Sequence, residues 1–160
     1  MDVVVPLVSR LSPSQRWSLL AGVYAFGCAA LTAVLLSDVL GLFAEVIGLP
    51  PTLSMLLLAS PALVAGAGIW WALVERRGAY TYPAGAAFGL LTALSTGAVW
   101  TVRFVSVWGV EMLTAGPVPL LVGFVLGMTA LAGVLVGLPF AYVRRRSGRR
   151  SDSAATANSL

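Results

Sequence analysis

The sequence has no histidine, no lysine and only one cysteine, and these absences narrow the chemistry available to the chain. Haem, zinc and copper sites are built mainly from histidine and cysteine, so such a site would need unusual ligands here. Nucleotide-driven work is equally unexpected, because the chain has neither a glycine-rich phosphate loop nor a lysine. Serine and threonine hydroxyls lack a histidine or lysine to activate them. We therefore predict no metal, no cofactor and no catalytic residue, and we expect Cys28 to be a thiol in an apolar helix.

Charged residues are also scarce, at 10% of the chain against about a quarter in a soluble domain. Hydrophobic residues make up 59%, and the mean hydropathy is +0.93. A soluble domain of this composition could not cover its surface with polar groups, so lipid must solvate much of the chain. The net charge of +4 would favour nucleic-acid binding only if the arginines clustered on one folded surface, but they flank apolar runs instead. The expected partner is the lipid bilayer, and no nucleic acid is expected.

Four runs without a charged residue are long enough to cross a bilayer, which takes about 20 apolar residues. The predicted spans are 17–37, 52–74, 83–102 and 118–143. The fourth run is the longest and contains Pro139, so it is expected to tilt or to bend there. The sequence thus predicts an all-α integral membrane protein with a four-transmembrane-helix bundle over 17–143. A short segment, 1–16, precedes the bundle and a tail, 144–160, follows it.

The arginines predict the orientation of the bundle. Nine of the ten lie before the first span, between the second and third, or after the fourth, and only Arg103 lies on the other side. Short loops rich in arginine stay in the cytoplasm, so both termini are expected to be cytoplasmic. All basic residues are arginine, which indicates a GC-rich prokaryotic genome and hence a plasma-membrane location. The tail 144–160 starts with a basic cluster, has no apolar period, and is predicted to be disordered.

The two predicted outer loops share one plan. In 38–51 apolar residues recur at helical spacing, which predicts a short helix that lies in the membrane interface or extends the first span. The loop 103–117 is similarly apolar, carries one glutamate, and leads through prolines into the fourth span. Each half of the chain ends in a basic cluster. This pattern is compatible with a tandem duplication of a two-helix hairpin, although low-complexity apolar sequence also mimics repeats.

The third span combines most of the candidate functional residues. Small residues spaced by four mark where helix backbones approach in lipid, and they place this span against the second and fourth. Arg103 follows the span and could pair with Glu111 or Glu45, or extend to the outer headgroups. The candidate functional or packing residues are Arg103, Glu111, Glu45, Thr92, Ser95, Thr96, Gly85, Gly89 and Gly97.

Three functional interpretations follow from this inventory. The first is a non-catalytic membrane subunit that assembles with, stabilises or regulates another membrane protein. The second is a small pore or carrier that works as a homo-oligomer, supported by the glycines and hydroxyls of the third span but not by any ionisable group inside the spans. The third is a lipid-modifying enzyme that would use Arg103, Glu45 and Glu111. A carrier should place Thr92 and Thr96 on a water-filled cavity, whereas a simple bundle should bury them against a neighbouring helix.

Overall fold

The computed structural model describes residues 12–78, 80–116 and 118–157, except for the side chains of 121 and 148–157. Every regular element in these ranges is a helix. The main helices are α2 (Pro13–Leu35), α3 (Ser37–Val46), α4 (Ser54–Trp70), α5 (Tyr82–Trp108) and α6 (Val118–Ala157). A π-helix, η1 (Trp71–Glu75), continues α4, and a 3-10 helix, η2 (Val110–Thr114), follows α5. Four helical segments are long and apolar enough to cross a membrane, which confirms the predicted all-α class and the predicted number of candidate spans.

The ends of the helices follow local chemistry. Ser12 caps α2: its hydroxyl accepts a hydrogen bond from the Gln15 backbone N–H, and the Ser12 backbone N–H donates to the Gln15 side-chain oxygen. Helix α5 begins behind the cap residue Thr81 and runs to Trp108, beyond the predicted end at 102. It ends at Gly109, whose φ of 83° suits glycine alone. Arg103 ends the charge-free run in the sequence, but it does not end the helix.

The segment after the first span forms a separate helix, α3, because the α-helical conformation is interrupted at Leu36. Its bounds, Ser37–Val46, are shorter than the predicted 38–51 loop. Helix α6 runs unbroken through Pro139 to Ala157, so residues 144–157 of the predicted tail are helical in the structure, and 158–160 lie outside the described residues. A helix already nucleated by the spanning segment can continue at little cost through arginine and alanine, which both favour helix.

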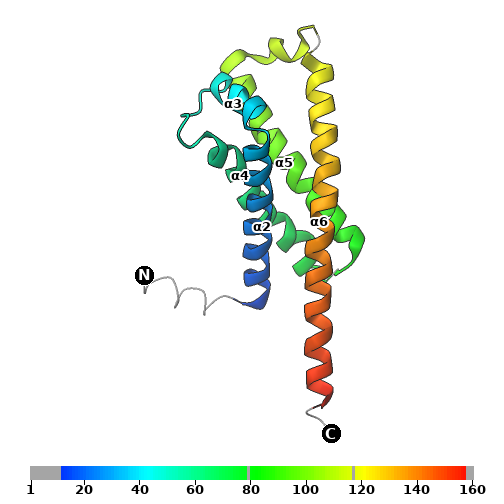
Figure 1. Cartoon of the computed structure of the whole chain (residues 1–160). Coiled ribbons are helices and arrows are strands. Elements are labelled where there is room, and N and C mark those ends of the chain that lie inside the picture. The colour runs from blue at the N-terminus through cyan, green and yellow to red at the C-terminus, as the bar shows by residue number, and fades with distance from the viewer. Residues whose placement is uncertain (1–11, 79, 117, 158–160) are drawn as a thin grey trace.

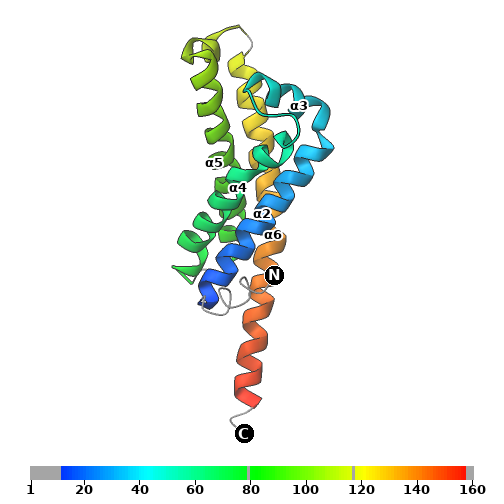
Figure 2. The same ribbon diagram turned by 90° about the vertical axis from the view of Figure 1, so that its left-hand side faces the viewer.

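The bundle consists of two helix pairs placed side by side. Helix α2 packs mainly on α4 and α5 mainly on α6, and contacts between α4 and α5 join the pairs. Figure 1 shows α3 and η2 together at one end of the bundle, opposite the start of α2. Figure 1 also shows that α5 and α6 diverge towards that same end, and Figure 2 shows that the last part of α6 extends beyond the start of α2. We call the end that contains Trp17, Glu75 and Arg144 the arginine end, and the end with α3 and η2 the far end.

Within each helix pair, the two helices approach each other most closely at glycines. A Cβ atom built on Gly66 would lie 3.2 Å from the Cα of Gly22, and one on Gly133 would lie 2.5 Å from the carbonyl oxygen of Gly89. No larger side chain fits at such crossings, which is why small residues mark helix contacts in membranes. The partners are 44 positions apart in both pairs, from 22 to 66 and from 89 to 133. The two hairpins therefore pack in the same register.

Aromatic rings fill the space between the pairs near the arginine end. Trp70 and Phe88 are each 1% exposed. The ring centroid of Trp70 lies 5.1 Å from that of Phe88 and 4.7 Å from that of Phe140, both in edge-to-face geometry. Tyr24 stacks on Phe140, and its hydroxyl donates to the Val136 carbonyl at 2.9 Å. These contacts join α2, α4, α5 and α6, so the two hairpins meet in an aromatic core.

Candidate functional site

The most polar buried site in the described chain is an ion pair at the arginine end. Arg144 of α6 donates from Nε to Glu75 Oε1 at 3.0 Å and from Nη2 to Glu75 Oε2 at 3.3 Å. The Glu75 side chain is only 3% exposed, and that of Arg144 is 16% exposed. The indole N–H of Trp70 donates to Oε1 and the Tyr80 hydroxyl donates to Oε2, both at 3.3 Å. Four hydrogen bonds therefore occupy the roughly four acceptor positions of the carboxylate.

The π-helix η1 explains how Trp70 and Glu75 come together. In an α-helix, positions five apart differ by about 140° around the axis, because each residue turns about 100°. The wider π turn pairs each residue with the one five positions on, so both side chains can point to the same side. This allows the Glu75 carboxylate to enter the core beside the Trp70 indole, instead of facing lipid or headgroups.

Aromatic rings enclose the guanidinium of Arg144. Its central carbon lies 4.7 Å from the ring centroid of Trp17 and 4.6 Å from that of Tyr80, distances at which cation–π attraction operates. The site draws on α2, the end of α4, the α4–α5 connection and α6. Its carboxylate has no free lone pair with which to act as a base. We conclude that this cluster, defined by Glu75, Arg144, Tyr80, Trp70 and Trp17, joins the two hairpins.

Sequence reasoning missed this cluster. Glu75 was not among the candidate residues, and Arg144 was placed only in the basic start of the tail 144–160. One signal was available, because Glu75 is the single acidic residue between the second and third spans and closes an otherwise apolar run. Trp70, which was not among the candidate residues either, lies in the core.

The three charged candidate residues lie at the far end but do not form a common site. Arg103, Glu45 and Glu111 are all exposed, and the structure shows no ion pair between Arg103 and either glutamate. The Arg103 guanidinium instead lies beside Gly48, in the connection from α3 to α4. The expected pairing with Glu111 needed a helix that continued past Gly109, and α5 ends before it.

Two tryptophans of α5 connect this helix to α3 and α4 at the far end. The indole N–H of Trp100 donates to the Leu58 carbonyl at 2.9 Å, and that of Trp108 donates to the Val46 carbonyl at 3.0 Å. Val46 ends α3, so these bonds hold α5 against both α3 and α4. Ala44, Ile47 and Leu58 form a small buried cluster beneath them. The far end is therefore held by packing and indole hydrogen bonds, not by charge.

The hydroxyl candidates lie on α5 within the bundle. Thr92 is 6% exposed, and its hydroxyl has no hydrogen-bond partner in the part of the chain whose side chains are described. Thr96 donates to the Thr92 carbonyl at 2.9 Å, one turn back in its own helix. Ser95 is half-buried. Neither of the two described hollows, which lie at the arginine end, is lined by these residues.

The glycine candidates lie where α5 contacts α6. Gly85 packs against Gly137 and Ala141, and Gly89 packs against Gly133. A Cβ built on Gly97 would lie 2.7 Å from a methyl group of Leu126, so this glycine also makes room for α6. In contrast, a Cβ on Gly123 or Gly127 would meet nothing within 4 Å. The small residues of α5 are thus used inside the bundle, and two glycines of α6 remain open.

In the described residues, no group of three or more cysteine, aspartate or glutamate side chains is placed to hold a metal ion. Comparisons with protein-family models, with curated proteins and with solved structures returned no match. The function must therefore be argued from the geometry of the chain.

Proposed function

We propose that the protein is a non-catalytic membrane subunit that assembles with a helix of another membrane protein through the far half of α6. The observation that carries this proposal is the open glycine face of α6, formed by Gly123 and Gly127. Around it, Leu120 is 80% exposed, Phe124 is 67% exposed and Leu131 is 64% exposed. Lipid covers large apolar side chains as well as a protein does, but only a second helix gains close backbone contact from a glycine pair.

The polar groups of the bundle support the same proposal. Glu75 and Arg144 neutralise each other, and Thr96 returns its hydrogen bond to its own helix. Thr92 is buried without lining a described hollow, as expected for a bundle more than for a carrier. A homo-oligomeric pore remains the second candidate, because the open glycines of α6 could equally meet another copy of the chain. The enzyme hypothesis has less support, since its three charged residues are not brought together.

We further propose that the bundle lies in the plasma membrane with both ends of the chain in the cytoplasm. Trp17 near the start of α2 contacts Arg144 near the end of the spanning part of α6, so these two points lie at one end of the bundle. The excess of arginine at that end supports a cytoplasmic side. Single cysteines in a Cys28→Ala background test the orientation. A cysteine at Thr114 should react with an impermeant thiol reagent in intact cells, and one at Ser147 should not; the reverse pattern would overturn it.

We also propose that the chain arose by duplication of one helical hairpin. A shift of 67 positions carries Gly22 to Gly89 and Gly66 to Gly133, and these glycines contact each other within each helix pair. The same shift carries Pro50, which precedes α4, to Pro117, which precedes α6. Two apolar segments often resemble each other by chance. A shift that also aligns the contacting glycines of one half with those of the other half is less easily obtained by chance. Expressed as two separate hairpins, the halves should reassociate in detergent; failure of the isolated halves to insert as helices would count against this origin.

A pull-down in mild detergent followed by mass spectrometry tests the proposed function. The wild-type protein should recover a membrane partner in constant proportion, and the double substitution Gly123→Leu with Gly127→Leu should release it. Gly27→Leu is the matched control, because Gly27 is also an exposed glycine of a spanning helix with nothing near its Cβ position. Leucine favours helix more than glycine does, so neither variant should weaken the bundle itself.

Two results would refute the assembly hypothesis. One is recovery of the wild-type protein as a monomer without any constant companion. The other is a partner that the Gly123 and Gly127 variant retains as well as the control does. A complex made only of copies of this chain would favour the pore. In that case, replacing Thr92 and Thr96 by valine should change solute flux in liposomes, and unchanged flux would exclude a role for these hydroxyls in transport.

A further inference from the structure

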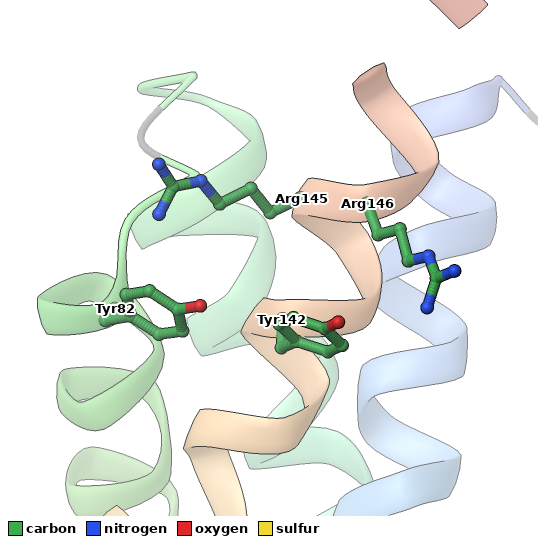
Figure 3. A pocket seen from close by; sticks show the side chains of 4 residues that line it. All are labelled: Tyr82, Tyr142, Arg145 and Arg146. Atoms are coloured by element: carbon green, nitrogen blue, oxygen red, sulfur yellow. The ribbon is translucent and has the colours of Figure 1, made fainter. Parts of the chain in front are cut away.

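A shallow hollow of about 330 Å³ lies at the arginine end, between the start of α5 and the end of the spanning part of α6. Its lining consists of Tyr82, Tyr142, Arg145 and Arg146, and we call it the double-arginine hollow. Figure 3 shows both tyrosines below and the two guanidinium groups extending to either side of α6. Its volume is at the lower end of the range for ligand sites, roughly 300–1,000 Å³. The hollow therefore offers space for one small charged group.

The two arginines of the hollow differ from their neighbour Arg144. Arg144 is neutralised by Glu75, but Arg145 and Arg146 are exposed and pair with no carboxylate among the described side chains. The guanidinium carbon of Arg145 lies 5.4 Å from the ring centroid of Tyr82, a cation–π contact that does not neutralise the charge. The hollow thus carries two uncompensated positive charges, which favour an anion.

The other lining groups also suit an anion. Tyr82 and Tyr142 both line the hollow, and a phenol hydroxyl can donate to an acceptor there. Tyr82 is the first residue of α5, a helix of 27 residues whose N-terminus carries partial positive charge. A phosphate oxygen can accept hydrogen bonds from guanidinium and phenol groups together, and arginine binds phosphate in two-point geometry.

The surface of α6 next to the hollow indicates where the anion comes from. Leu131, Leu135, Tyr142 and Arg146 are spaced by four, seven and four positions, which places them on one stripe of the helix. Leu135 is 69% exposed and Tyr142 is 50% exposed, so the stripe faces outward along its length. An acyl chain lying on the leucines would bring its headgroup to the tyrosine and the arginines. Free phosphate would make no use of this apolar stripe.

We propose that the double-arginine hollow binds the phosphate of an anionic phospholipid. Basic pockets at the ends of spanning helices are known to hold such headgroups. The hollow works on whichever side of the membrane the arginine end lies, since it needs only headgroup depth. The residues that line the hollow are not part of the proposed partner face on the far half of α6.

Native mass spectrometry of the purified full-length protein in mild detergent tests the site. Phosphatidylglycerol and phosphatidylcholine with identical acyl chains are titrated, and the retained lipid is counted. Wild type should prefer phosphatidylglycerol. The substitution of Arg145 and Arg146 by glutamine should weaken this binding by about thirtyfold, since each surface arginine contributes roughly a factor of five. Substituting Arg76 and Arg77 by glutamine removes the same charge from the same end without touching the hollow, and should change binding less than threefold.

A second variant, Tyr82→Phe with Tyr142→Phe, keeps all charges and should weaken phosphatidylglycerol binding in the same direction, by a smaller factor. Far-ultraviolet circular dichroism confirms that each variant is folded. Equal loss in the Arg76 and Arg77 control would show charge attraction without a site. Equal binding of phosphatidylcholine, or displacement of the lipid by millimolar inorganic phosphate, would also overturn the proposal, the latter by identifying a free-anion site.

Discussion

Neutralising Glu75 should weaken the contact between the two hairpins and so lower the free energy of unfolding. Glu75→Gln keeps the size of the side chain and its bond from Trp70, but it leaves the Arg144 guanidinium with no opposite charge. Removing one partner of a fully buried ion pair costs about 3–5 kcal/mol. Arg144 is still 16% exposed and lies near the headgroups, so it can turn partly towards water. We therefore expect a loss of about 2–3 kcal/mol in the free energy of unfolding, below the range for a fully buried pair.

The assay is reversible unfolding in mild detergent with increasing dodecyl sulfate, followed by far-ultraviolet circular dichroism. A double-mutant cycle with Arg144→Gln isolates the pair, because groups in direct contact typically show a coupling energy of about 0.5–3 kcal/mol. The double variant should be less destabilised than the two single losses together. Glu111→Gln is the control: this exposed carboxylate pairs with nothing described, so its loss should change stability by less than about 0.5 kcal/mol.

Additive losses in the cycle would refute the assignment. They would mean that Glu75 and Arg144 contribute separately, through solvation or topology, and that the hairpins are held by the aromatic core alone. A large effect of Glu111→Gln would likewise contradict the argument, because it would attribute the stability to general charge and not to the buried pair.

Three further predictions concern single side chains and use the same unfolding assay. Gly89→Ala should destabilise the protein by about 1–3 kcal/mol, because its Cβ would overlap the Gly133 carbonyl. The control Gly27→Ala should be neutral or stabilising, since nothing lies near its Cβ position. Equal effects of the two substitutions would contradict the close approach of α5 and α6 at Gly89 and Gly133. Thr92→Val should stabilise by about 1 kcal/mol, since it removes a buried hydroxyl that has no described partner, and a loss of stability would reveal a bond to a ligand or partner. Tyr24→Phe should cost about 1 kcal/mol through its lost bond to an α6 carbonyl, and an unchanged midpoint would argue against that bond.

The membrane class and the approximate place of the four spans could be predicted from the sequence. Lipid offers no hydrogen bonds to the backbone, so each crossing must be a helix of sufficient length, and charge-free runs reveal it directly. The bounds were less predictable. Hydropathy stops at Arg103, but backbone hydrogen bonding continues until Gly109 ends α5. For the same reason the polar tail after Val143 was expected to be disordered, although α6 continues through it.

Only the tertiary structure distinguished three adjacent arginines that look alike in the sequence. Arg144 donates to a carboxylate 69 positions away, while Arg145 and Arg146 face outward. A turn of about 100° between neighbouring residues gives each a different environment, but sequence does not say which helix lies opposite. That depends on the glycine crossings, whose register follows from the packing of complete helices. The sequence by itself determined that this chain forms four helices long and apolar enough to span a membrane. The tertiary structure decided which of its charged side chains are buried and which are exposed.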